Sequence, residues 1–362
     1  MADKDLTGIL GDGKAVRAGD WERMRDIVPR GYVCYRAPYP LAITGEFTDA
    51  AWDRAPWTDD FVDIEGEAGR KPLFRTRAKM LWDDDYFYVG ARLEEPHLWG
   101  TLTRKNSIIF HDNDFEVFID PDGDNHDYYE FEINALGTIW ELNLLKPYKD
   151  GGQAIHASNI EGLKSAVHLR GTLNDPADED EGWSVEIAFP WRGLARYNGG
   201  VAPPVHGNLW RVNFSRVEWK HEIVDGRYRK IEGIAEDNWV WSPQGIIDMH
   251  RPERWGMVRF SMAVPGDEPF RPDPTLPARE MLMEVYNRQK VFYGRSGTWA
   301  GSFGDLGIDP DDGAGPARLT TINSGPGGFC AAAVVRLPGG GEQTIFVDHE
   351  SLITSISASD GD

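Results

Sequence analysis

The sequence predicts a mainly β protein, an antiparallel β-sandwich of the jelly-roll kind followed by a small C-terminal α+β unit. Between Tyr32 and Met262, short apolar or alternating runs are separated by Gly, Pro, Asp and Asn, which is typical of strands and turns. Loops instead of regular helices separate these runs, which favours a sandwich over a parallel α/β sheet. After Met262 a helical spacing of large side chains appears, followed by further strand-like runs.

The predicted elements of the first part follow in chain order. An N-terminal extension over 1–31 is expected to hold a short helix within 20–28. The sandwich domain is expected over 32–262. Eight runs in it have the composition and alternation of strands: 72–82, 85–95, 114–121, 128–134, 137–145, 182–190, 209–219 and 254–262.

The C-terminal part is expected to begin with a linker over 263–277, which is rich in Pro and acidic residues. Residues 278–362 are expected to form a small unit of one helix and a sheet. A Gly turn in it separates two strand-like runs, "GFCAAAVVRL" and "TIFVDHESLITSI". Gly297 closes the helical pattern. The side chains at helical spacing are Met281, Val285, Gln289 and Phe292.

Charge and composition exclude several classes of partner. The 59 acidic residues exceed the 38 basic ones and leave a formal charge of −21, which repels phosphate backbones and anionic lipid. We therefore expect neither nucleic acid nor a membrane as a partner. The sequence also predicts neither an export signal nor a membrane-spanning segment. Cys34 and Cys330 are too few for a disulfide framework or a cysteine-ligated zinc site, and two free thiols or one bridge both remain open. The oligomeric state is not indicated.

An acid-rich turn joins two of the predicted strands. Asp120, Asp122 and Asp124 have the first three ligand offsets of a calcium loop, but Asn125 stands where that loop needs Gly and Phe131 where it needs Glu. We therefore expect a polar hairpin turn and no EF-hand at these three residues.

Three glutamates share one face of the same two strands, namely Glu116, Glu130 and Glu132. Like charges on neighbouring strands destabilise the pair unless a cation offsets them. Arg75 and Arg77, on another predicted strand, are expected to pair with them, and a shared metal is the other option. Such a face suits bidentate hydrogen bonding to vicinal hydroxyls, although a solvated face with ordinary ion pairs fits the sequence equally well.

Tryptophan adds to this picture. Of 14 Trp residues, 12 lie between Trp52 and Trp255. Three of these lie in polar segments whose composition is typical of turns. These three are Trp99, Trp239 and Trp241. Because a Trp in a polar loop can stack on the C–H face of a sugar, we expect them to be platforms.

Five ordered motifs within residues 32–262 give the strongest signal. "PLAITGEFTDAAWDRAPW", "LWDDDYFYVGARLEEPHLW", "DNDFEVFIDPDGDNHDYYEFEINALGTIWELN", "GWSVEIAFPW" and "WSPQGIIDMHRPERWGMVRF" resemble the successive signatures of family 9 carbohydrate-binding modules and their family 9-like relatives. The resemblance implies a β-sandwich, a sugar clamped between two tryptophans, and structural calcium in some members. It also implies an oligo- or polysaccharide partner and an extracytoplasmic location.

Under this resemblance, individual residues acquire roles. Trp99 matches the position of one stacking tryptophan, and Trp239 or Trp241 lies in the segment that supplies the other. Polar residues near these platforms would bond the sugar hydroxyls: Arg104, Lys105 and Asn238.

Two function classes remain in order of preference. The first is a non-catalytic glycan-binding protein that has no catalytic residue, requires no cofactor and holds at most a structural calcium. The alternative is a glycoside hydrolase in which Glu116 and Glu130 lie at the carboxyl separation of a retaining pair. A purely structural sandwich ranks third. No HExxH, GxSxG or P-loop pattern occurs in the sequence.

Overall fold

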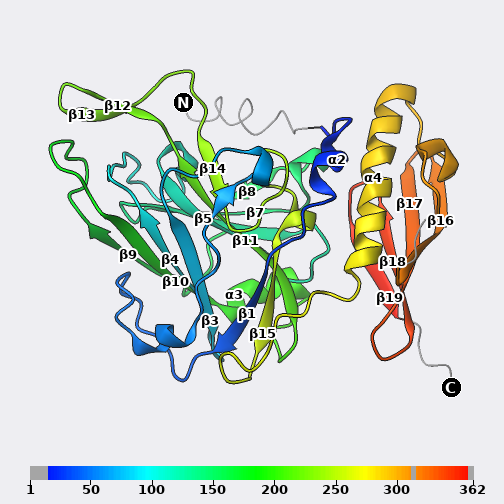
Figure 1. Ribbon diagram of the computed structural model, residues 1–362, viewed down its shortest axis with the longest axis horizontal. Coiled ribbons are helices and arrows are strands. Elements are labelled where there is room, and N and C mark those ends of the chain that lie inside the picture. The colour runs from blue at the N-terminus through cyan, green and yellow to red at the C-terminus, as the bar shows by residue number, and fades with distance from the viewer. Residues whose placement is uncertain (1–14, 311–314, 358–362) are drawn as a thin grey trace.

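The computed structural model describes residues 15–310 and 315–357. Thirteen strands form one large sheet: β1 (Gly31–Arg36), β2 (Val62–Asp63), β3 (Thr76–Trp82), β4 (Tyr86–Glu94), β5 (Asp114–Asp120), β6 (Tyr128–Asn134), β7 (Ile139–Leu144), β8 (Ala154–His156), β9 (Lys164–Arg170), β10 (Gly182–Pro190), β11 (Leu209–Glu218), β14 (Asp237–Val240) and β15 (Gly256–Ser261). The main path runs β8-β7-β6-β5-β11-β15-β1-β3-β4-β10-β9, and β14 and β2 extend it beside β11. Figure 1 shows this sheet curled on itself.

The two halves of the curled sheet pack face to face and make the sandwich core. Alternation sends Phe115, Val117 and Ile119 of β5 inward, where they are fully buried with the inward residues of β3, β4 and β10. The rings of Phe131 on β6 and Phe189 on β10 meet edge to face at a centroid distance of 5.5 Å. The predicted β-sandwich and its predicted inner face are therefore confirmed.

One strand departs from the antiparallel expectation. β1 runs parallel to both of its neighbours, β15 and β3, whereas the other pairs of the large sheet are antiparallel. β1 lies between the two halves of the sheet path, so this strand connects them.

Short elements complete the first part of the chain. The expected N-terminal helix is α2 (Asp20–Met24), and α3 (Trp191–Leu194) follows β10. The hairpin β12 (His221–Val224) and β13 (Arg227–Lys230) forms a separate two-stranded sheet. All eight predicted strands occur, whereas β1, β2, β8, β9, β14 and the hairpin were not predicted.

The C-terminal unit consists of α4 (Leu276–Ser296) packed on a four-stranded sheet, and Figure 1 shows it beside the sandwich. The sheet order is β16 (Ala317–Gly325), β17 (Gly328–Arg336), β18 (Glu342–Asp348) and β19 (Ile353–Ser357). The helix and sheet were expected, but β16 was missed. The run expected as one strand is divided into β18 and β19 by a turn at Ser351, whose φ is 62°.

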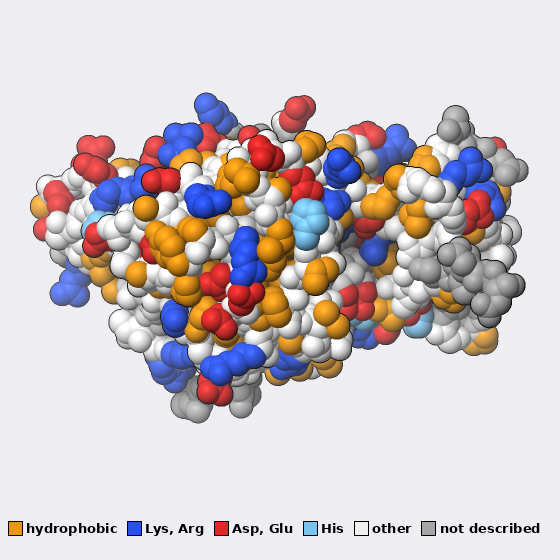
Figure 2. All heavy atoms as spheres, turned by 90° about the horizontal axis from the view of Figure 1, so that it is seen from below, with side chains coloured by type: hydrophobic (Ala, Val, Ile, Leu, Met, Phe, Trp, Pro, Cys, Tyr) orange, Lys and Arg blue, Asp and Glu red, His pale blue; other side chains and the backbone are white. Residues whose placement is uncertain are grey.

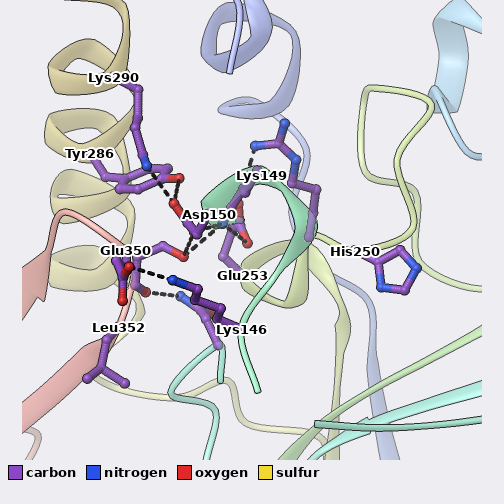
Figure 3. A network of polar contacts seen from close by, with 12 residues as sticks. Lys146, Lys149, Asp150, His250, Glu253, Tyr286, Lys290, Glu350 and Leu352 are labelled. Carbon is purple, nitrogen blue, oxygen red and sulfur yellow. Dashed lines mark hydrogen bonds and ion pairs between the residues drawn. The ribbon is translucent and has the colours of Figure 1, made fainter. Parts of the chain in front are cut away.

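A buried ionic network joins this unit to the sandwich (Figure 3). Asp150 accepts hydrogen bonds from the hydroxyl of Tyr286 at 2.6 Å and pairs with Lys290 Nζ at 2.7 Å, both residues being on α4. Lys149 Nζ lies 3.3 Å from the carboxylate of Glu253. Lys149 and Asp150 have fully buried side chains, so the contact excludes water.

Two further observations bear on the sequence expectations. Cys34 is buried and Cys330 is exposed, and both are free thiols. No helix among residues 15–310 and 315–357 is long and apolar enough to cross a membrane.

Candidate functional site

The predicted charged residues fall on opposite outer faces of the sandwich. Ala78 of β3 and Val117 of β5 both point into the shared core, so Arg77 and Glu116, their neighbours by one position, point away from it in opposite directions. The predicted pairing of Arg75 and Arg77 with the glutamates is therefore wrong, because the core separates the two groups. Arg75 instead pairs with Asp60 at 2.7 Å.

The predicted tryptophan clamp is contradicted by the geometry. Trp99, Trp239 and Trp241 are only 3%, 2% and 1% exposed, so none of them presents a ring face to a ligand. Trp239 lies on β14, opposite Arg216 of β11, and belongs with Trp241 to the sandwich core. The sequence around Trp239 and Trp241 resembles a loop because charged and turn-forming residues surround β14, a strand only four residues long. Trp99 does lie in a loop, but its side chain is buried there.

The polar residues assigned to that clamp do not gather around it. Arg104 is exposed and lies in the turn before Asn106. Lys105 pairs with the buried carboxylate of Glu141 at 3.0 Å. Asn238 is half-buried and lines a cavity with Glu116, Glu130 and Glu132.

An open groove lies on the outer face of the half-sheet β3-β4-β10-β9. It has a volume of about 400 Å³. The cross-strand register places Arg77, Arg92, Ser184 and His168 in one row across the four strands. The groove is lined by Glu46, Arg75, Arg77, Arg92, Glu94, His168, Arg170 and Ser184.

Positive charge in this groove is incompletely offset. Arg77 and Arg92 stand directly opposite each other, a destabilising arrangement for like charges. Among the described residues, no ion pair joins either guanidinium to a carboxylate. Burial, and then the charges of Arg75 and Arg92, lower the pKa of Arg77. Burial, and then Arg170, lower the pKa of Arg92.

An aromatic ring flanks the groove. The guanidinium carbon of Arg77 lies 4.3 Å from the centroid of the Trp57 ring, and that of Arg92 lies 5.4 Å from it. Trp57 is half-buried. The cation–π contacts hold the two guanidinium groups over this ring.

The opposite outer face carries a cluster of acidic side chains. One carboxylate oxygen from each of Asp114, Glu116 and Glu132 lies within 4.8 Å of the others. Glu116 and Glu132 are cross-strand partners on β5 and β6. A cavity of about 80 Å³ adjoins the glutamates, and Phe110, Tyr148 and other residues line it.

Burial dominates the electrostatics of this acidic cluster. It raises the pKa of Glu116 to about 7. Burial, and then the charge of Glu116, raise the pKa of Asp114 and of Glu132 well above their usual values. The side chain of Glu130 is close by and its pKa is raised for the same two reasons.

The predicted hairpin turn between β5 and β6 is confirmed. Asp120 accepts hydrogen bonds from the backbone N–H groups of Gly123 and Asn125, and Asp124 accepts one from His126. Strands instead of helices flank the turn, so it is no EF-hand. Oxygen atoms of Asp120, Asp122 and Asp124 do lie within 4.8 Å of one another.

Sequence reasoning missed several residues that line the two sites. Arg92 stands at an outward position of a predicted strand, so alternation was a signal for it. His168 and Arg170 lie on β9, which was not predicted. Asp114 is the first residue of β5. It lies two positions before Glu116 and therefore on the same face of the strand.

Residues 43–202 match the family model described as "Carbohydrate family 9 binding domain-like". The chain is 31% identical over 125 residues to Exoglucanase XynX of Acetivibrio thermocellus, which is 34% of this chain and 10% of that protein. It is 33% identical over 124 residues to Endo-1,4-beta-xylanase A of Thermoanaerobacterium saccharolyticum, which is 34% of this chain and 9% of that protein. The chain thus spans about a tenth of the length of these relatives.

A solved structure is also similar. It is a carbohydrate binding module of family 9 from Caldicellulosiruptor kristjanssonii in complex with cellotriose, with a TM-score of 0.42 and 16% identity over 67% of this chain and 100% of that one. All eight residues that line the groove fall inside the matched range 43–202. Residues 43–202 of this chain are thus similar to the carbohydrate family 9 binding domain-like family.

Proposed function

We propose that the protein is a non-catalytic glycan-binding protein and that the arginine-lined groove on β3, β4, β10 and β9 is its binding site. The observation that carries the proposal is the position of this groove. All of its lining residues lie within the range that matches a carbohydrate-binding family. This site differs from the predicted tryptophan clamp, but Arg75 and Arg77 remain among the proposed ligand-binding residues.

The size of the groove supports a sugar ligand. Its volume of about 400 Å³ lies within the roughly 300–1,000 Å³ that is usual for small-molecule sites. The cavity beside Glu116 and Glu130, at about 80 Å³, is far below that range. A glycosidic bond would have to enter this cavity for the glycoside hydrolase alternative, and the geometry therefore favours binding.

The chemistry of the lining fits hydroxyl groups. A guanidinium donates two parallel hydrogen bonds and suits a pair of vicinal oxygens. The guanidinium groups of Arg77 and Arg92 form no ion pair with a carboxylate among the described residues, so their N–H donors can bind a ligand. Glu94 and Glu46 are exposed carboxylates that can accept from sugar hydroxyls. A pyranose ring in the groove would thus meet donors and acceptors together.

The ligand class is proposed from the relatives. The matched proteins are named as an exoglucanase and as xylanases, and a similar structure holds cellotriose. We propose a neutral β-linked gluco- or xylo-oligosaccharide, met outside the cytoplasm.

Calorimetric titration with cellotriose and with a xylo-oligosaccharide tests the proposal. We expect Arg77→Ala and Arg92→Ala each to weaken binding by at least about tenfold, which corresponds to roughly 1.4 kcal/mol. The matched control is Arg227→Ala, an exposed arginine on the β12–β13 hairpin, which should leave affinity unchanged. Unchanged affinity in both groove variants, with loss in Arg104→Ala or Lys105→Ala, would return the site to the predicted clamp segment.

A further inference from the structure

Three cationic side chains surround one indole ring beside the arginine-lined groove. The guanidinium carbons of Arg77 and Arg92 lie 4.3 and 5.4 Å from the centroid of the Trp57 ring, and Nζ of Lys79 lies 4.6 Å from it. None of the three forms an ion pair within the described part of the chain. Lys79 donates a hydrogen bond to the carbonyl of Trp52 at 2.8 Å, whereas neither guanidinium donates one to a described residue. The N–H donors of both guanidinium groups are therefore available to a ligand.

The three cations also repel one another. Arg77 and Arg92 are register partners on β3 and β4, and Lys79 lies two positions after Arg77 on the same face of β3. Like charges on facing positions destabilise a sheet. Burial lowers the pKa of Lys79, and the charges of Arg92 and Arg77 lower it further, whereas Asp53 raises it. A bound anion would offset this repulsion, and a neutral ligand would leave it in place.

The other basic residues of the groove differ, because each lies close to a carboxylate. The pairs are Arg75 with Asp60 at 2.7 Å, His168 with Glu46 at 3.4 Å and Arg170 with Glu181 at 3.7 Å. The chain has 59 acidic residues for 38 basic ones, so carboxylates are abundant. Arg77 and Arg92, at the centre of the row across the strands, nevertheless lack one.

These contacts point to an acidic ligand: we propose that the glycan bound in the groove carries a carboxylate, as a uronic acid residue does, and that Arg77 and Arg92 bind this carboxylate together. The inference rests on the proposed function, because it uses the same groove and keeps the β-linked chain as the backbone of the ligand. A carboxylate is planar and accepts two parallel hydrogen bonds from one guanidinium. Such charge-assisted bonds are about twice as strong as neutral ones, so a carboxylate should be preferred over a hydroxyl group.

The lining of the groove also limits the charge of the ligand. Glu46 and Glu94 belong to it, and they would repel each further negative charge. A singly charged carboxylate is therefore favoured over a doubly charged phosphate ester. The volume of about 400 Å³ lies within the range that is usual for small-molecule sites, so one uronic acid residue fits by size.

Calorimetric titration of the full chain with two matched ligands tests the inference. One is a xylo-oligosaccharide that carries a single glucuronic acid residue, and the other is the methyl ester of the same compound, which lacks the charge. We expect the acid to bind at least about tenfold more tightly than the ester at low salt. The preference should shrink in high salt, because the screening length falls from about 30 Å at 0.01 M to about 3 Å at 1 M.

Variants assign the preference to the two arginines. Arg77→Gln and Arg92→Gln should each reduce the ratio of acid to ester affinity towards one, whereas Arg77→Lys, which keeps the charge, should retain part of it. Arg77 is half-buried and Arg92 is exposed, so the variants should keep the wild-type melting temperature. The matched control is Arg227→Gln on the β12–β13 hairpin, which should keep the full preference.

The unsubstituted xylo-oligosaccharide separates this inference from the proposed function. If it binds and Arg77→Ala weakens its binding, while acid and ester bind equally, the inference is wrong and the proposed function stands. A preference for the acid that persists in both Gln variants would also overturn the inference. So would inorganic sulfate that competes as strongly as the acid, because the groove would then bind anions in general. Absence of binding to every one of these glycans would overturn both proposals.

Discussion

At the scale of single residues, burial decides what each aromatic or charged side chain can do. Trp239 illustrates this, because its ring packs edge to face on Phe74 at 6.1 Å and lies 5.1 Å from the guanidinium carbon of Arg216. Both contacts are inside the protein. An indole in an exposed loop could stack on a sugar, whereas the indole of Trp239 packs in the core and stabilises the fold.

Truncation of Trp239 tests this core role. We expect Trp239→Ala to lower the free energy of unfolding by about 3–5 kcal/mol, as large-to-small changes of buried aromatic residues do. Urea unfolding followed by fluorescence or circular dichroism gives the value. Trp239→Phe, which keeps part of the ring packing, should cost less. A fully stable Trp239→Ala variant that fails only in glycan binding would restore the clamp.

At the scale of elements, the contact between α4 and the sandwich depends on Asp150. This residue belongs to the short 3-10 helix η4 (Tyr148–Asp150), and its carboxylate faces Tyr286, Lys290 and Ser351. Burial alone would raise its pKa, but Lys149 and Lys290 lower it overall. A buried carboxylate that is satisfied in this way keeps the neighbouring lysines paired (Figure 3).

Removing that carboxylate should loosen the C-terminal unit. We expect Asp150→Ala to destabilise the protein by about 3–5 kcal/mol, because it leaves the buried charge of Lys149 with one partner fewer. Differential scanning calorimetry measures the loss, and limited proteolysis of the segment before α4 should become faster. Asp150→Asn, which keeps the shape and part of the hydrogen bonding, is the matched control. Equal stability of Asp150→Ala and wild type would show that the network does not hold the contact.

At the scale of the whole molecule, acidic charge is both abundant and partly internal. The chain has a formal charge of −21, and on the face shown in Figure 2 acidic side chains are interspersed with basic and hydrophobic ones. In the interior, Nη2 of Arg216 lies 2.8 Å from a carboxylate oxygen of Glu95 and 2.8 Å from one of Glu218, and both carboxylates are buried. One guanidinium cannot neutralise two carboxylates, so one acid is left in excess.

This excess predicts how stability varies with pH. Burial, although opposed by Arg216, raises the pKa of Glu218 from 4.5 to about 8. A folded-state pKa above the unfolded value means that the folded state binds the proton more tightly. The stabilisation is fully present below about pH 4.5 and is lost as the pH rises towards 8.

Replacing the residue should remove that dependence. We expect the unfolding free energy of Glu218→Gln to fall less between pH 5 and 8 than that of the wild type, as measured by urea unfolding at several pH values. Glu222→Gln, an exposed glutamate on the nearby hairpin, should keep the wild-type slope. Identical slopes in all three proteins would contradict the assignment to Glu218.

The sequence by itself determined the β-rich class and the face of each long strand. Alternation in β5 and β6 is enough to send Phe115 and Phe131 inward and Glu116 and Glu132 outward, because the side-chain period of a strand is fixed at two. The helix α4 followed in the same way from its spacing. Short strands such as β14 carry too few residues for a periodic signal, and Trp239 was misplaced for that reason.

Only the tertiary structure decided which outward residues meet. Arg77 and Glu116 have the same local pattern, yet the curl of the sheet puts them on opposite sides of one core. Arg92 and His168 meet in the groove because β10 lies between their strands, a pairing that joins distant segments of the chain. Local sequence fixes the direction in which a side chain points, whereas long-range strand order and the cost of burying charge fix which side chains come together and what they can bind.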